Sequence, residues 1–201
     1  MIPRFFDERA YYEKKNCVDP NTRFWGSASV ANARYAAILS HVDLSGKSVV
    51  DIGCGAGDFL SHLKREKKQP SKYVGLDVVP RFVEEAARNH PDAEFFVSDV
   101  ASPDWAPRAS EWCIANGLFG HSQESEAQWW ERFSLITKRM WDSASRGMVV
   151  TLISTRSNKR NPAAHYIDPE AAIRFFIDNY GWKVLIDHSY LNNDFLLRVE
   201  K

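Results

Sequence analysis

One stretch in the first third of the sequence limits the possible folds more than any other feature. Residues 48–52 form a short apolar, β-branched run, which is typical of a buried parallel strand. Gly53, Gly55 and Gly57 follow at once, and apolar residues then recur at helical spacing over residues 59–63. A strand, a glycine turn and a helix in succession aim backbone N–H groups at the polar or anionic part of a nucleotide-like ligand.

A second apolar run ends in a carboxylate. Residues 72–77 are expected to form the next strand, and Asp77 is its last residue. Asp77 lies about 20 residues beyond Gly57, which is the spacing expected of an acid that binds ribose hydroxyls. The alternative is an acid in a surface turn.

Asp58 indicates which kind of nucleotide the turn serves. A dinucleotide-binding turn needs a small residue at this position for close packing of helix on strand, so an aspartate argues against NAD or NADP. The pattern of residues 51–57 instead resembles the glycine motif of class I S-adenosylmethionine-dependent methyltransferases. In that family one acid opens the motif, a second ends the second strand, and a third follows the third strand. Asp51, Asp77 and Asp99 occupy these places.

The resemblance covers roughly residues 27–200 and implies the fold, the cofactor and its contacts. The expected fold is α/β, a doubly wound, mostly parallel seven-stranded sheet of the Rossmann-like methyltransferase type with an antiparallel C-terminal hairpin. The expected cofactor is S-adenosylmethionine. The residues expected to bind it are Asp51, Gly53, Cys54, Gly55, Gly57, Asp77, Val78, Asp99, Val100 and Asn116.

The chain is long enough for one domain with a sizeable core. Residues 1–26 are charged and aromatic-rich with little periodicity, and they are expected to be either a lid over the site or a packed or mobile extension. Residues 27–201 are expected to form the methyltransferase domain. The expected helices span residues 27–42 and 126–141, run from the glycine loop to about Lys68, and start at Pro80 and at Asp168–Pro169. The remaining expected strands span residues 93–98, 110–115, 147–154, 182–188 and 195–199.

Composition excludes several classes of function. The 26 basic and 26 acidic residues cancel, so we expect no nucleic-acid partner. No run of residues is apolar enough to span a membrane, and the start of the chain has no signal-peptide core. The three cysteines, Cys17, Cys54 and Cys113, have no metal-binding or disulfide spacing, which favours a cytoplasmic protein and no metal site.

Two loops are expected to carry the reaction. Asn116 and His121 follow the fourth strand, where the carboxyl ends of parallel strands present ligands. Asn116 is a candidate for holding the methionine moiety or the nucleophile, and His121 is a candidate general base. Arg156 and Arg160 follow the fifth strand in a loop that either clamps an anionic substrate or is simply solvated.

The predicted function is transfer of a methyl group from S-adenosylmethionine to a small molecule, with an anionic acceptor as one option. The loop after the fourth strand lacks the Asn-Pro-Pro-aromatic motif of methyltransferases that modify amide or base nitrogens. The alternatives are a non-catalytic or regulatory S-adenosylmethionine-binding protein and, less favoured, a nicotinamide-dependent oxidoreductase. The acceptor, the methylated atom and the oligomeric state are not specified by the sequence.

Overall fold

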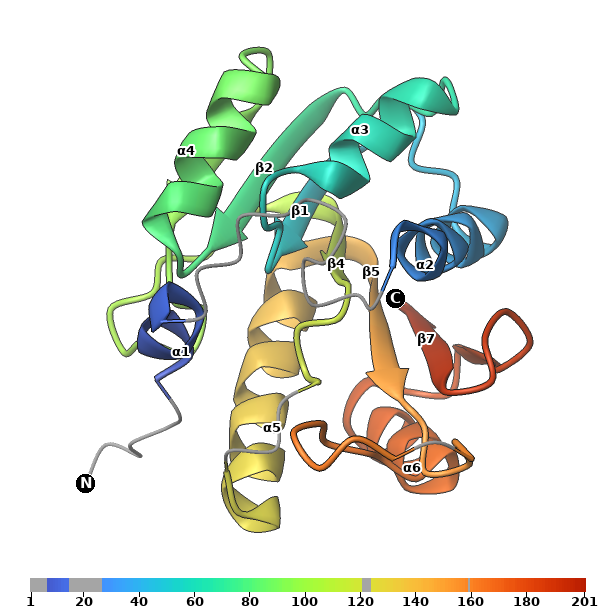
Figure 1. The fold of residues 1–201 in the computed structure, drawn as a ribbon. Helices are drawn as coiled ribbons and strands as arrows, with labels where there is room; N and C mark the ends of the chain where they lie inside the picture. The colour runs from blue at the N-terminus through green and yellow to red at the C-terminus, as the bar shows by residue number, and fades with distance from the viewer. Residues whose placement is uncertain (1–6, 15–26, 121–123, 159) are drawn as a thin grey trace.

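The computed structural model describes residues 7–14, 27–120, 124–158 and 160–201. Within these residues, a central sheet of seven strands has helices packed on both of its faces (Figure 1). Its strands are β1 (Ser48–Ile52), β2 (Lys72–Asp77), β3 (Glu94–Val97), β4 (Ser110–Ala115), β5 (Ala144–Ile153), β6 (Val184–Asp187) and β7 (Asp194–Glu200). Its helices are α1 (Glu8–Lys14), α2 (Ala28–His41), α3 (Asp58–Arg65), α4 (Pro80–Asn89), α5 (Glu126–Ser143) and α6 (Pro169–Tyr180).

The strand order is β3-β2-β1-β4-β5-β7-β6. The five strands from β3 to β5 pair in parallel, whereas β7 pairs antiparallel with both β5 and β6. The predicted doubly wound sheet with an antiparallel C-terminal hairpin is therefore confirmed. The order reverses between β1 and β4, and ligands bind at such a switch point in open α/β sheets.

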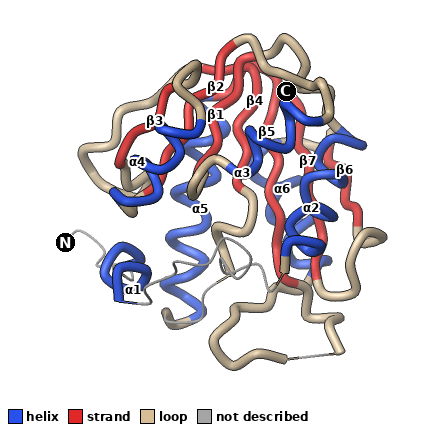
Figure 2. Tube along the Cα trace, turned by 45° about the horizontal axis from the view of Figure 1, so that its top comes forward, coloured by secondary structure: helices blue, strands red, loops and turns tan. Residues whose placement is uncertain are grey.

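Two apolar layers hold the helices on the sheet. Helices α5 and α6 cover one face and bury Phe133 and Phe176 against it. Helices α2 and α3 cover the opposite face, where Ile38 and Leu63 are fully buried. Figure 2 shows the strands as one twisted layer between the helices. Successive side chains of β1 point to opposite faces of the sheet, so Val50 packs in one apolar layer and Val49 in the other.

Side-chain caps define the starts of two helices. The Ser27 hydroxyl accepts a hydrogen bond from the N–H of Val30 at the start of α2. The Asp168 carboxylate caps α6 ahead of Pro169, which occupies the first helical position.

Several predicted details of the elements were wrong. Residues 8–14 form a short helix in a segment where no periodicity was expected. Helix α3 ends at Arg65 rather than near Lys68, because Lys67 adopts a left-handed conformation (φ 57°) and the N–H of Lys68 bonds back to the carbonyl of Leu63.

Candidate functional site

A cavity of about 400 Å³ opens at the carboxyl ends of the parallel strands. Its wall includes residues that follow β1, β2, β3, β4 and β5. All but one of the residues predicted to bind the cofactor line this cavity, and the exception is Gly57. The predicted residues that line the cavity are Asp51, Gly53, Cys54, Gly55, Asp77, Val78, Asp99, Val100 and Asn116.

The glycine loop is held in place by backbone hydrogen bonds. The N–H groups of Gly53 and Cys54 both donate to the carbonyl of Leu76 in β2, at 2.7 and 3.0 Å. Gly55 has φ of 54°, and a Cβ atom there would meet nothing within 4 Å. The loop therefore leaves an open cradle in which a ligand can approach the backbone closely.

Gly57 has a structural role instead. It precedes α3 with φ of 82°, and a Cβ at this position would lie 2.8 Å from the His90 ring. The N–H of His90 Nε2 can donate to the Gly57 carbonyl at 3.1 Å. Gly57 is thus required by the close approach of α3 to the end of α4.

Asp77 connects the end of β2 to the glycine loop. One carboxylate oxygen accepts a hydrogen bond from the N–H of Gly55, and the other accepts one from the N–H of Val79, both at 2.9 Å. Burial raises the pKa of Asp77, while these backbone hydrogen bonds act in the opposite direction. The carboxylate thus faces the cavity at the position predicted for a ribose ligand.

Asp51 is a buried acid in the cavity wall, only 2% exposed. The Tyr73 hydroxyl donates a short hydrogen bond to it. Burial raises the pKa of Asp51 to about 7, a shift that the Tyr73 hydrogen bond and the nearby Asp77 charge modify in opposite directions. A carboxyl group with this pKa changes its charge near neutral pH. In its charged form it would attract a cationic ligand in the cavity.

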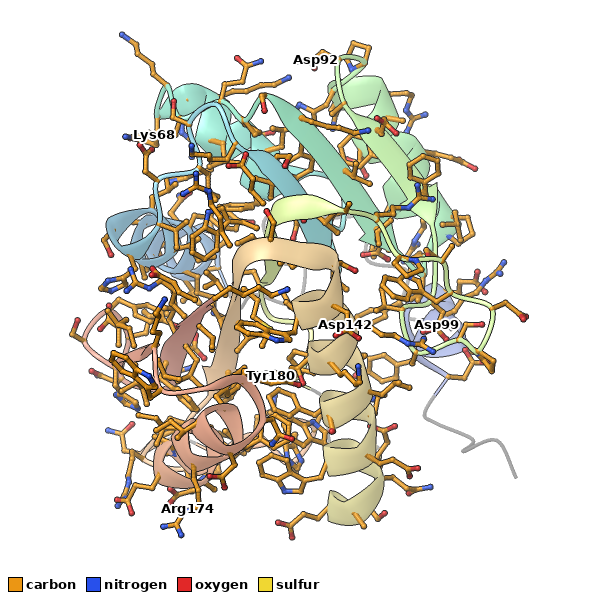
Figure 3. All side chains as sticks on the ribbon, turned by 180° about the vertical axis from the view of Figure 1, so that it is seen from behind. Lys68, Asp92, Asp99, Asp142, Arg174 and Tyr180 are labelled. Atoms are coloured by element: carbon orange, nitrogen blue, oxygen red, sulfur yellow. The ribbon has the colours of Figure 1, made fainter. Side chains whose placement is uncertain are left out.

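The third predicted acid is placed differently. Asp99 is exposed and lies in the connection after β3, on the side of the molecule where α1 also lies (Figures 1 and 3). Its carboxylate accepts a hydrogen bond from the N–H of Ala101 at 2.8 Å. The neighbouring Val100 is buried, and Arg139 donates to its carbonyl. Asp99 therefore stands at the rim of the cavity and Val100 in its wall.

The predicted reaction loops are only partly brought to the cavity. Asn116 is buried at the end of β4 and lines the cavity. Arg156 is exposed and pairs with Glu170 at 3.1 Å, and Arg160 donates to the Thr155 carbonyl at 2.6 Å. Neither arginine lines the cavity, so the predicted anion clamp is not formed by them. His121 and Lys159 lie outside the described residues.

Sequence reasoning did not identify several residues of the cavity wall, among them Arg34, Thr151 and Asn161. Arg34 is buried in α2 and forms an ion pair with Asp194 of β7. The sequence did contain a signal for Thr151, because it is a polar residue within an otherwise apolar strand. Tyr11 and Tyr12 come from α1, whose sequence gives no helical signal.

We expect His90 to make the protein less stable in mild acid. Burial and the ammonium of Lys64, 3.4 Å from Nδ1, lower the pKa of His90 below its ordinary value. As pH falls below about 6.5 the unfolded chain gains a proton that the folded protein still excludes, so the free energy of unfolding decreases. Urea unfolding between pH 7.5 and 5.5 measures this. A His90→Gln variant should show a shallower pH dependence, and an unchanged slope would remove His90 as the cause.

Comparison with known proteins places the fold. Residues 49–139 match a family model described as a methyltransferase domain. Magnesium protoporphyrin IX methyltransferase (ChlM) from Synechocystis PCC 6803, solved with S-adenosylhomocysteine, is similar with a TM-score of 0.64 and 14% identity, over 96% of this chain and 97% of that one. The N-methyltransferase NodS from Bradyrhizobium japonicum WM9, also solved with S-adenosylhomocysteine, has a TM-score of 0.67 and 13% identity, over 96% and 98%.

The pyocyanin biosynthetic protein PhzM has a TM-score of 0.67 and 17% identity, and the match covers 98% of this chain but 62% of that one. These similarities confirm the predicted fold, which is that of class I S-adenosylmethionine-dependent methyltransferases. This chain has that fold, and its domain matches the methyltransferase family over β1 to α5.

No helix among the described residues is long and apolar enough to cross a membrane. Within the same part of the chain, histidine, cysteine and acidic side chains form no group that could hold a metal ion.

Proposed function

We propose that this protein binds S-adenosylmethionine in the cavity and transfers its methyl group to a small-molecule acceptor. The observation that carries the proposal is the Asp77 carboxylate, held by the N–H groups of Gly55 and Val79 at the carboxyl edge of the sheet. Each of its oxygens accepts one backbone hydrogen bond and has a second lone pair with which to accept a ribose hydroxyl. The sulfonium of this cofactor carries an already activated methyl group.

The rest of the cavity also fits this cofactor. The cavity wall also includes the apolar residues Leu76, Phe82, Val100 and Leu118, against which a flat adenine ring can pack. At the other end of the glycine loop, Asp51 can face the cationic methionine portion, and burial in a low-dielectric wall strengthens that attraction.

The same loop disfavours a dinucleotide. Asp58 is the first residue of α3 and lines the cavity. A pyrophosphate at this helix N-terminus would meet a carboxylate of like charge, which offsets the attraction of the helix dipole. This supports a cofactor without phosphate groups.

We also propose that α1 covers the cofactor side of the cavity, as a lid. Tyr11 and Tyr12 line the cavity, and Arg81 at the start of α4 donates a hydrogen bond to the Tyr12 carbonyl at 2.9 Å. This bond ties α1 to the segment that follows Asp77. The small enclosed volume and the absence of net charge favour a small molecule over a nucleic acid as acceptor.

We expect Asp77→Ala to weaken binding of S-adenosylhomocysteine about tenfold or more. The variant removes a charged acceptor for the ribose hydroxyls, a loss of about 1.5–3 kcal/mol. Isothermal titration calorimetry measures the affinity, and circular dichroism checks that the variant is folded. Glu94→Ala, an exposed acid outside the cavity on β3, is the matched control. An unchanged affinity in folded Asp77→Ala protein would disprove the ribose assignment.

Turnover distinguishes an enzyme from a protein that only binds the cofactor. The wild-type protein is incubated with S-adenosylmethionine and a panel of carboxylates, phenols and amines, and S-adenosylhomocysteine is quantified by mass spectrometry. Release above the uncatalysed rate with any acceptor supports the enzyme. Binding of the cofactor with no release across the panel would favour the regulatory alternative.

A further inference from the structure

Thr151 is a buried polar residue in the middle of β5, only 2% exposed. Its hydroxyl accepts a hydrogen bond from the N–H of Gly117 at 2.8 Å and donates one to Oδ1 of Asn116, also at 2.8 Å. Because β4 and β5 are adjacent parallel strands, Thr151 reaches the two residues that follow β4. The Thr151 hydroxyl therefore connects β5 to the segment that follows β4, and both contribute to the cavity wall.

This contact fixes the orientation of the Asn116 side chain. The hydroxyl has one proton, and Asn116 is the acceptor for it within the described residues. The reversed amide would leave a buried hydroxyl proton without an acceptor, which is costly. Asn116 is itself 6% exposed and lines the cavity, so its NH₂ group is the end that can reach a ligand.

A second amide in the same cavity is oriented in the same way. Asn161 lies in the segment between β5 and α6, and its Oδ1 accepts a hydrogen bond from the N–H of Ala163 at 2.9 Å. A backbone N–H can only donate, so this assignment is unambiguous. The NH₂ group of Asn161 has no hydrogen bond within the described part of the chain. Both amides thus keep their donors for a ligand.

Few side chains that accept hydrogen bonds lie in the part of the cavity wall formed by β4, β5 and the segments that follow them. The carboxylates in the wall, Asp51, Asp58, Asp77 and Asp99, belong to β1, α3, β2 and the connection after β3. The described residues of β4, β5 and the segments that follow them contribute no acidic side chain to the wall. The carbonyl of Gly120, which also lines the cavity, accepts a hydrogen bond from the N–H of His165 at 3.0 Å and keeps one lone pair.

From these contacts we propose that the acceptor is an ionised oxygen, a phenolate or carboxylate, and that Asn116 and Asn161 bind it through their NH₂ groups. Thr151 is the positioning residue that turns Asn116 toward it. This proposal rests on the proposed methyl-transfer function and names its acceptor class. An amine would present N–H groups to two NH₂ groups, which cannot accept them, and it needs its one lone pair for attack. An oxygen has further lone pairs, so it can accept both amides and still attack.

Methyl transfer to an ionised oxygen needs no general base. The acceptor oxygen forms a bond to the transferred methyl carbon while the carbon–sulfur bond breaks, and the electron pair of that bond stays on sulfur. The acceptor has already released its proton to water before it binds. The negative charge of the oxygen and the positive charge of the sulfonium are both lost in the step.

A pair of probes of the same shape tests the proposal. 4-Nitrophenolate and 4-nitroaniline are titrated at pH 8 into wild-type protein saturated with S-adenosylhomocysteine, with binding followed by the side-chain NH₂ resonances of ¹⁵N-labelled Asn116 and Asn161. We expect 4-nitrophenolate to bind about tenfold or more tightly, and to shift both resonances, because charged hydrogen bonds are lost with the aniline. Equal affinities, a preference for the aniline, or no binding of either probe up to the solubility limit would overturn the proposal.

Variants separate positioning from structure. Thr151→Val should abolish most of the preference for 4-nitrophenolate, and Thr151→Ser, which keeps the hydroxyl, should restore it. Thr137→Val is the matched control. Thr137 is a fully buried threonine of α5 that does not line the cavity, and its hydroxyl forms a hydrogen bond with the Tyr180 hydroxyl of α6 at 2.8 Å. A Thr137→Val variant that loses the preference equally would make the Thr151 effect a general consequence of destabilisation.

Exchanging the donor for a negatively charged acceptor provides the complementary test. Asn116→Asp places an acceptor where the donor was, so 4-nitrophenolate should bind more weakly and the aniline relatively better. An unchanged preference in this variant would contradict the proposal. The S-adenosylhomocysteine titration is performed first, because failure of that binding refutes the proposed function. Normal cofactor binding with no oxygen preference refutes only the acceptor class.

Discussion

Replacing Asp51 with asparagine is expected to weaken binding of S-adenosylmethionine by about 10-fold to 100-fold at pH 8, because a buried charge opposite a cationic ligand is removed. The wild-type affinity should itself decrease as pH falls below about 7, since protonation neutralises Asp51. The Asp51→Asn variant should show no such decrease. Calorimetric titrations between pH 6 and 8.5 measure both effects.

Tyr73→Phe gives a sharper version of this test. The Tyr73 hydroxyl stabilises the charged form of Asp51, so its removal should raise the pKa of Asp51 and move the midpoint of the binding profile to higher pH. A midpoint that stays in place, or a pH-independent wild-type affinity, would show that Asp51 does not face the bound cofactor.

The same carboxyl group should destabilise the protein when no ligand is bound. Between about pH 4 and pH 7 folded Asp51 keeps a proton that the unfolded chain has released, so stability falls as pH rises through this window. Asp51→Asn should therefore unfold at a higher urea concentration than the wild-type at pH 8. This combination, a more stable protein that binds its cofactor less well, distinguishes a functional acid from a structural one.

The largest loss of stability is expected from Asp194→Ala. Arg34 is 7% exposed and Asp194 is fully buried, and the Nε and Nη2 atoms of Arg34 lie 2.6 and 2.5 Å from the same Asp194 oxygen. Removing the carboxylate takes the Asp194 charge away from a buried guanidinium, at a cost of about 3–5 kcal/mol. Urea unfolding at pH 7.5 measures the change.

The double variant Arg34→Met/Asp194→Leu is the control for this prediction. Replacing both charges by apolar groups should recover much of the lost stability, because a buried ion pair often contributes little over a well-packed apolar pair. A single variant that loses under about 1 kcal/mol would show that Arg34 finds equivalent solvation elsewhere.

The sequence predicted the elements whose signals are local. The bounds of β4, Ser110–Ala115, were predicted correctly, because the apolar run of residues 112–115 follows two polar residues and ends at Asn116. The glycine loop and Asp77 were placed correctly because their conformations and spacing are properties of a continuous strand–turn–helix unit.

Features that depend on neighbours distant in sequence were not predicted. Asn116 was identified, but its orientation depends on Thr151, which reaches it only because β5 lies beside β4. Arg156 was expected either to clamp an anionic substrate or to be solvated, because its own loop has no acid, yet Glu170 of α6 pairs with it from the next helix. Arg34 lies 160 residues from its partner Asp194, so no local pattern could join them.

Titration of the purified protein with cofactors tests the central claim most directly. We expect S-adenosylmethionine and S-adenosylhomocysteine each to bind one site per chain with micromolar affinity, while NAD and NADP give no heat above dilution. Tight binding of a nicotinamide dinucleotide with no response to either adenosyl ligand would contradict the account of the glycine loop and Asp77.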